Sequence, residues 1–170
     1  MTAKKSSESF TQMTEMVLPN DTNTLGNLMG GRLLHWMDIV SAISAQKHSN
    51  RVVVTASVDF VSFKESIKLG DVVTLIAKVT RAFKTSMEVH IEVWKENIPE
   101  GMKVKCNEAY YTFVAVDGNT RPIPVYEVIP ETEEEKSRFD GALRRRQVRL
   151  ILGGRMKPSE AMELKALFDV

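Results

Sequence analysis

The chain has 170 residues, a formal net charge of +1 at pH 7 and 43% hydrophobic residues, which is ordinary globular composition and argues against a disordered chain. A net charge so close to zero gives no reason to expect binding to nucleic acid or to a membrane surface. Cys106 is the only cysteine, so no intrachain disulfide can form, in keeping with a reducing compartment. The first ten residues lack the apolar run of a signal peptide, and no stretch approaches the roughly 18 apolar residues of a membrane span. We expect a cytoplasmic protein.

Residues 1–12 are polar and rich in Ser and Lys, and we expect them to form a flexible tail. The next distinct segment, residues 18–31, is dense in turn-forming residues and predicts a long loop. Loops of this length are usually functional or disordered. The turn formers are Pro19, Asn20, Asp21, Asn23, Gly26, Asn27, Gly30 and Gly31.

After Gly31 the sequence RLLHWMDIVSAISAQKH carries one largely apolar stripe at helical spacing and predicts a helix that ends near residues 48–50. Four strands are predicted next, over residues 51–63, 72–83, 86–94 and 104–116, separated by short turns. Short connections imply antiparallel pairing of successive strands. One long helix against such a sheet is an α+β arrangement, and the helix covers only part of the sheet, so we expect pairing with a second copy.

A second helix is predicted beyond Pro130. Thr132 and Glu135 have the spacing of a capping box, and further glutamates place negative charge at the helix start. Gly153 and Gly154 end this helix, and a last short helix is predicted to start near Ser159.

Asp38 is the first candidate for chemistry. It shares a helix face with Gly31 and with small residues, which allows close packing against another element. A carboxylate packed there needs a partner, because burying a lone charge is costly. Spacing alone leaves a partnered carboxylate and an exposed one equally open.

Two neighbouring features bear on Asp38. The helix-start amides at Gly30 and Gly31 could stabilise an oxyanion, although a plain turn is the favoured interpretation of a Gly-Gly pair taken alone. Asn23 could orient a water or a carbonyl, or simply form an Asx turn, the commoner role for a loop asparagine. Gly31 lies about 10 Å from Asp38 along the helix axis, so a substrate must lie along the helix or a second subunit must contribute.

Other chemistry lacks support in the sequence. None of the three histidines has a partner at metal-binding spacing, and we expect no metal site; His90, between two glutamates, is predicted to be solvated. Cys106 is predicted to be a structural thiol. Motifs of serine hydrolases, P-loop proteins and Rossmann enzymes are absent from the sequence. Two basic clusters, residues 81–84 and 144–149, could bind phosphates, or the second could offset the acidic start of its own helix.

The segments LPNDTNTLGNLMGGRLLHWMD, VVTASVDFVSF, LGDVVTLIAKVTRAFKTSMEVHI and ETEEEKSRFDGALRRRQVRL resemble the hotdog-fold acyl-CoA thioesterases. More closely, residues 15–150 resemble the cytosolic acyl-CoA hydrolase group, which includes brain and acetyl-CoA-hydrolysing enzymes and bacterial relatives. The resemblance implies a hotdog domain over residues 13–150, with a long central helix wrapped by an antiparallel sheet, C-terminal helices and an extension over residues 151–170. It also implies paired protomers in a trimer of dimers, a homohexamer. Close relatives often carry two fused hotdog domains, whereas this chain has one.

The same resemblance implies hydrolysis of a fatty acyl-CoA to free fatty acid and CoA, with CoA as part of the substrate and no cofactor required. Asp38 corresponds to the family's acid, as general base or as nucleophile, Asn23 to its loop asparagine, and the amide near Gly31 would polarise the thioester carbonyl. The active site would lie between protomers, so that Gly31 and Asp38 converge only across an interface. The implied CoA contacts are Thr55, Ala56, Ser57, Lys84, Thr85, Ser86 and either Arg144 or Arg145. Two rivals are a hotdog protein that binds acyl-CoA without turnover and a hotdog dehydratase using His35.

Overall fold

The computed structural model describes residues 2–168. The chain forms two compact units, Met1–Ile129 and Pro130–Val170. Within the part that the structure describes, no helix is long and apolar enough to cross a membrane.

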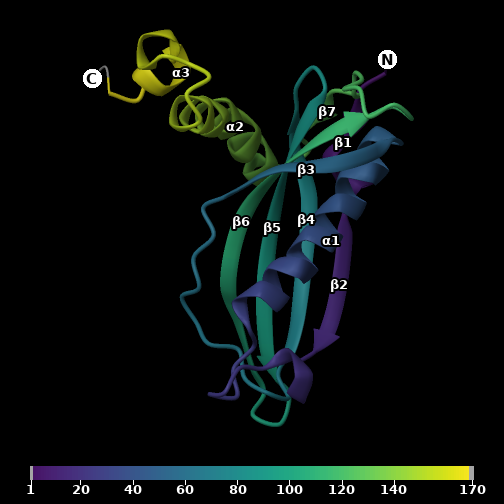
Figure 1. Cartoon of the computed structure of the whole chain (residues 1–170), viewed down its shortest axis with the longest axis vertical. Coiled ribbons are helices and arrows are strands. Elements are labelled where there is room, and N and C mark those ends of the chain that lie inside the picture. Colours follow the sequence, from purple (N-terminus) through teal and green to yellow (C-terminus); the bar gives the residue numbers. More distant parts are fainter. Residues whose placement is uncertain (1, 169–170) are drawn as a thin grey trace. The chain divides into compact units, whose positions relative to one another are not determined.

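A five-stranded antiparallel sheet dominates the first unit, in the order β2-β4-β5-β6-β3 (Figure 1). The strands are β2 (Thr11–Met16), β3 (Val52–Asp59), β4 (Val72–Ala82), β5 (Ser86–Asn97) and β6 (Met102–Val116). The helix α1 (Gly30–Ser49) runs along one face of this sheet (Figure 1). This wrapped arrangement confirms the predicted α+β hotdog fold.

Alternation along β4 and β5 builds the core. From Val73 to Val79 and from Met87 to Val93, every second residue faces α1 and is fully buried, as the period of a strand requires. The helix contributes a matching stripe of buried side chains, and each fully buried aliphatic residue stabilises the fold by roughly 1.5–3 kcal/mol. The strand residues are Val73, Leu75, Ala77, Val79, Met87, Val89, Ile91 and Val93, and the helix residues are Leu33, Trp36, Met37 and Val40.

The helix α1 ends where the sequence predicts. Asn50 adopts a left-handed conformation with φ 53°, a common C-terminal cap, and its amide donates to the Gln46 carbonyl. Lys47 lies in the last turn, where positive charge is favourable next to the unpaired carbonyls, whereas the neighbouring His48 is buried and burial lowers its pKa.

The prediction that each strand pairs with the next one along the chain is correct for β4, β5 and β6 and wrong for β3. β3 pairs with β6 and lies at the sheet edge, and it ends at Asp59, short of the predicted Phe63. Phe60 adopts φ 61°, which turns the chain out of the strand. The irregular residues 60–71 then lead from one side of the sheet to the other, so this connection is longer than the hairpins from which pairing was predicted.

The expectation of a flexible tail over residues 1–12 is wrong for the residues described there. Besides β2, the structure has β1 (Lys4–Lys5), which pairs in parallel with β7 (Val128–Ile129), and a 3₁₀ turn, η1 (Ser6–Ser9). Ser6 and Ser9 are buried. The Ser9 hydroxyl donates to the Ser6 carbonyl at 2.7 Å and accepts from the Val79 amide at 2.9 Å. These serines satisfy buried backbone groups, a role that their polar character conceals in the sequence.

The second unit contains α2 (Glu133–Leu152), the short turn η3 (Pro158–Glu160) and α3 (Met162–Lys165). The predicted capping box is present: the Glu135 amide donates to the Thr132 hydroxyl at 3.1 Å, and the Thr132 amide donates to the Glu135 carboxylate at 3.2 Å. The Leu164 amide donates to the Gln147 side chain and ties α3 to α2. The division between units therefore falls after Ile129, not after residue 150, because α2 packs with the C-terminal helices.

Candidate active site

A groove of about 490 Å³ opens beside α1. It is lined by Gly31, Leu34, His35 and Asp38 of α1, Val58 of β3, Val61 and Phe63 of the segment after β3, and Tyr111 of β6. Gly31 and Asp38 are two helical turns apart on one side of α1, and they line this same groove within a single chain. Two turns correspond to about 10 Å, so lining one groove does not bring the two groups to the same reacting atom, and their convergence across a subunit interface stays a prediction.

Asp38 is a partnered carboxylate. The Thr55 hydroxyl on β3 donates a hydrogen bond to Asp38 Oδ1 at 2.8 Å, across the gap between helix and sheet edge. Asp38 is half-buried and Thr55 is exposed in the single chain. The bond fixes one carboxylate oxygen and leaves Oδ2 to act on a ligand in the groove. The family resemblance assigned Thr55 to CoA, and sequence reasoning missed its contact with Asp38, because no local pattern reports which strand residue faces a helix residue.

Tyr111 is a further groove residue that sequence reasoning missed. Its ring is buried, and its hydroxyl donates to the Leu34 carbonyl at 3.4 Å. Burial, together with the negative charge of Asp38, raises the pKa of Tyr111 to about 12. The phenol is consequently a protonated donor at neutral pH. The alternation of β6, with Ala109 and Phe113 buried on the same face, is the signal that could have found it.

The helix start is open toward the groove. A side chain at Gly31 would meet no heavy atom within 4 Å, so ligand atoms can approach the backbone closely here. The Arg32 and Leu33 amides donate to the Met29 carbonyl, so the open donors at the positive end of the helix dipole are the amides of Gly30 and Gly31. These amides are donors suited to a developing negative charge on oxygen.

Asn23 does not line this groove. Its side-chain oxygen accepts from the Leu25 amide at 3.0 Å and from the Asn27 amide at 3.2 Å, which is an Asx turn. The residue is exposed in the single chain, and the turn makes no use of its amide NH₂ group. The structure thus brings Asp38 and Thr55 into contact, places Gly31 two turns away along the same groove, and leaves Asn23 in the loop before α1.

The other residues predicted to contact CoA lie at separate places. Ala56 is exposed on β3, and the adjacent Ser57 hydroxyl donates to the Asp59 carboxylate at 3.3 Å. The turn between β4 and β5 holds Lys84, exposed, and Thr85, whose carbonyl accepts from the Ala115 amide. Ser86 begins β5.

Arg144 and Arg145 belong to α2, in the second unit. The Arg145 guanidinium donates to the Arg138 carbonyl at 2.6 Å. A Cβ at Gly141 would lie 2.7 Å from a guanidinium nitrogen of Arg145, so glycine there makes room for the arginine. Part of the basic run thus serves to order α2 itself.

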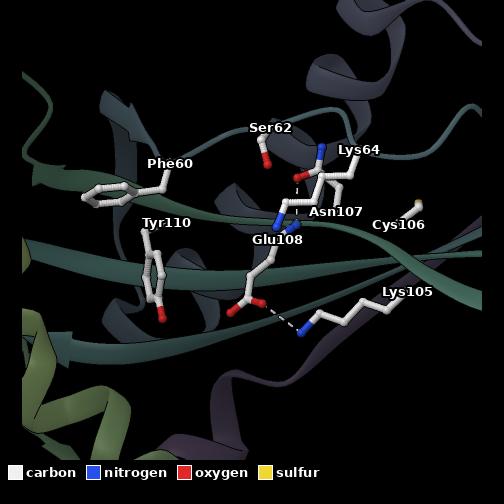
Figure 2. A pocket seen from close by; sticks show the side chains of 8 residues that line it. All are labelled: Phe60, Ser62, Lys64, Lys105, Cys106, Asn107, Glu108 and Tyr110. Carbon is white, nitrogen blue, oxygen red and sulfur yellow. Dashed lines mark hydrogen bonds and ion pairs between the residues drawn. The ribbon is translucent and has the colours of Figure 1, made fainter.

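A charged network occupies the sheet face away from α1, beside a pocket of about 430 Å³ (Figure 2). His90, predicted to be solvated, is buried and hydrogen-bonds Glu108 at 2.7 Å, while Lys105 bridges Glu108 at 2.8 Å and Glu92 at 3.1 Å. Burial by itself would raise the pKa of Glu108, but the bonds from Lys105 and His90 outweigh it and lower this pKa to about 2. The network ties the side chains of β5 to those of β6.

Two further expectations concern metals and the thiol. Cys106 is buried, its thiol donates to the Val93 carbonyl at 3.4 Å, and burial raises its pKa, as for a structural thiol. Among residues 2–168, no group of three or more His, Cys, Asp or Glu side chains could hold a metal ion.

A helix wrapped by an antiparallel sheet, with a partnered aspartate and open amides at the helix start, defines a hotdog protein with a hydrolytic type of site. Residues 25–102 match the thioesterase superfamily. The chain is 41% identical over 138 residues to "uncharacterized acyl-CoA thioester hydrolase YkhA" of Bacillus subtilis (strain 168), spanning 81% of this chain and 80% of that protein. The chain belongs to this family of acyl-CoA thioesterases.

Some relatives are larger. Mouse acyl-coenzyme A thioesterase 11 is 40% identical over 86% of this chain, which spans only 24% of the mouse protein. Among solved structures, an apo-hexameric acyl-CoA thioesterase superposes with a TM-score of 0.87 at 40% identity, covering 90% of this chain and 98% of that one.

A Staphylococcus aureus acyl-CoA hydrolase, solved with butyryl coenzyme A and coenzyme A, superposes with a TM-score of 0.82 at 36% identity, covering 90% of this chain and 95% of that one. Structures of that hydrolase include variants in which an asparagine, an aspartate and a threonine are each replaced by alanine. In that protein the asparagine precedes the aspartate by 15 residues and the threonine follows it by 17.

Proposed function

We propose that this protein hydrolyses the thioester of fatty acyl-CoA, releasing free fatty acid and CoA, and that the groove beside α1 is its active site. The observation that carries the proposal is the Asp38 carboxylate, held by Thr55 at 2.8 Å in a groove that also reaches the helix-start amides. Thioester hydrolysis needs a base or nucleophile together with a donor for the oxyanion, and these groups supply both.

In the proposed reaction the thioester carbonyl lies at the start of α1, where the Gly31 amide stabilises the oxyanion. Because Gly31 and Asp38 of one helix are about 10 Å apart along its axis, we assign this role to Asp38 of a neighbouring protomer. Its Oδ2 either takes a proton from the attacking water or attacks the carbonyl carbon to form a mixed anhydride. Single turnover in ¹⁸O-labelled water separates the two routes. Direct attack by water leaves the Asp38 carboxylate unlabelled, whereas hydrolysis of an anhydride at its aspartyl carbonyl puts label into it.

Asn23 and Thr55 complete the proposed catalytic set. Asn23, Asp38 and Thr55 have the same residue types and the same spacings, 15 and 17 residues, as the three positions replaced in the S. aureus hydrolase. Asn23 lies outside the groove of its own chain, so we propose that it acts in the groove of a neighbouring protomer, where its amide NH₂ group positions the water or the substrate.

The sheet edge favours such a neighbour. β3 is an edge strand, and Val52, Val54 and Val58 are exposed on it in the single chain. An exposed apolar edge strand is a template for pairing with another strand, here the β3 of a second copy. We propose a homohexamer, a trimer of such dimers, by analogy with the hexameric thioesterase of the same fold.

For the substrate we propose that CoA is bound by Ala56, Ser57, Lys84, Thr85 and Ser86, with Arg144 or Arg145 on its phosphates. Arginine and lysine suit phosphate recognition, and hydroxyl and backbone groups suit the rest of the molecule. Hydrolysis by these groups requires no cofactor. We also propose a cytoplasmic location, where acyl-CoA is available.

The test is release of free thiol from a panel of acyl-CoAs by the wild type and by Asp38→Ala and Asn23→Ala. We expect turnover by the wild type and a loss of several orders of magnitude in kcat for Asp38→Ala, with Glu100→Gln, an exposed carboxylate on the β5–β6 turn, as the unaffected control. Wild type that binds CoA yet releases no thiol from any acyl-CoA is instead a non-catalytic binding protein. Full turnover by Asp38→Ala refutes the role given to Asp38.

A further inference from the structure

Phe63 lines two cavities. One is the groove with Asp38, and the other is a cavity of about 340 Å³ at the start of α1. The second cavity is lined by Asn27, Leu28, Gly30, Leu33, Phe63, Glu65, Ser66 and Ile67. Phe63 is the residue common to both linings, so its side chain stands where the two spaces meet.

The ring of Phe63 packs against the helix start. Its Cζ atom lies 3.4 Å from the position that a Cβ would occupy at Gly30. Phe63 nevertheless belongs to the irregular segment after β3, and 55% of it is exposed in the single chain. Phe63 is therefore not part of the core, and we expect its replacement to leave the core packing of α1 on the sheet intact.

The chemistry of the second cavity suits an alkyl chain. Leu28, Leu33 and Ile67 supply apolar side chains to it. Of the described residues that line it, none carries a positive charge, and the carboxylate of Glu65 is within 3.5 Å of the Lys95 ammonium outside the lining. Phosphates of CoA are disfavoured beside a carboxylate, whereas a hydrocarbon tail gains from leaving water.

We infer that Phe63 sets the acyl chain length that the enzyme accepts, by closing the far end of the Asp38 groove against the second cavity. This inference rests on the proposed acyl-CoA thioesterase function. Short acyl chains fill the groove and contact the Phe63 ring. Longer chains must displace the ring to reach the cavity between Leu28, Leu33 and Ile67.

The experiment compares kcat/KM over a series of saturated acyl-CoAs for the wild type, Phe63→Ala and Phe63→Trp. In Phe63→Ala the optimum moves to longer chains, and the preference for the longer substrate rises about fourfold for each methylene that gains a buried place. Phe63→Trp moves the optimum to shorter chains. Phe60→Ala is the matched control, because Phe60 lies on the same segment but packs edge-on to Tyr110 at 6.5 Å, beside the other pocket (Figure 2).

Thermal unfolding and size-exclusion chromatography verify that each variant keeps its fold and assembly. If Phe63→Ala unfolds, the test uses Phe63→Leu and Phe63→Trp instead. The optimum chain length is then expected to become longer in Phe63→Leu and shorter in Phe63→Trp. If the Phe63 variants change kcat/KM by the same factor at every chain length, the role given to Phe63 is wrong, while the thioesterase proposal stands. Wild type without turnover refutes the proposed function, and affinities for non-hydrolysable acyl-CoA thioethers of varied length then test Phe63 separately.

Discussion

Replacement of Thr55 by valine tests the central contact of the proposed site. Valine keeps the β-branched shape that suits β3 and removes only the hydroxyl that donates to Asp38 Oδ1 at 2.8 Å. A hydrogen bond to a charged acceptor contributes about 1.5–3 kcal/mol. The bond is of ordinary length and Thr55 is exposed in the single chain, so the lower end applies, and we expect kcat to fall about tenfold.

The assay is thiol release at saturating acyl-CoA, with thermal unfolding measured on the same samples. Thr55→Ser retains a hydroxyl and is expected to recover most of the lost rate. Thr14→Val is the matched control, since Thr14 lies on β2 and its hydroxyl hydrogen-bonds the Thr74 hydroxyl at 3.4 Å, with no part in the proposed site. Full activity of Thr55→Val, or an equal loss in Thr55→Ser, would refute the claim that this hydroxyl positions Asp38.

Three further predictions concern the protonation and packing described above. Glu108 has its pKa lowered to about 2 in the folded state, so its contribution to stability is present above about pH 4.5 and is lost as the pH falls toward 2. Urea unfolding of the wild type and of Glu108→Gln measures this loss, because the difference between their free energies of unfolding shrinks over that range. Asp38→Asn removes a negative charge beside Tyr111, so the pKa of Tyr111 falls below its present value of about 12 in a phenolate absorbance titration. Ser9→Ala leaves the buried Val79 amide without its acceptor and lowers the free energy of unfolding by about 1–3 kcal/mol.

Each of these measurements has its own control. Gln12→Ala alters an exposed residue of β2 and is expected to leave stability unchanged, whereas an equal loss in both variants would contradict the role of Ser9. Subtracting the Tyr111→Phe titration assigns the phenolate signal, and an identical curve for Asp38→Asn would show that the two groups are not coupled. A constant difference between wild type and Glu108→Gln across the acid range would contradict the lowered pKa of Glu108.

Much of the fold could be predicted from the sequence because it rests on local periodicity. Helix α1, strands β4, β5 and β6 and the capping box of α2 each follow from patterns within a few turns or a single strand. The partner of β3 could not be predicted in this way. The strand order depends on the path of the irregular segment after Asp59. That segment begins at Phe60 with φ 61°, and no sequence pattern predicts this backbone conformation.

The residues of the candidate site likewise fall into those that local sequence patterns predict and those that they do not. Asp38 and the helix start are visible in one helical segment, so their candidacy follows from spacing and from the positive end of the helix dipole. Thr55 and Tyr111 reach the groove from β3 and β6, which are neighbours only in the folded sheet. Whether these two side chains reach the groove depends on the register in which β3 pairs with β6, and the sequence of one strand does not determine that register. The buried serines of η1 escaped notice for a related reason, because their acceptors and donors are backbone groups of distant elements.

β3 takes part both in the Asp38 groove and in the open edge of the sheet. The strand supplies Thr55 to Asp38 and Val58 to the groove, and it is also the sheet edge left open in the single chain. A partner strand added at that edge would hold the Thr55 register and would bring a second loop, with its own Asn23, toward the groove. Assembly and catalysis would then depend on the same few residues of β3. A site at a sheet edge is left open by its own chain, and this accounts for a groove that contains Asp38 without Asn23.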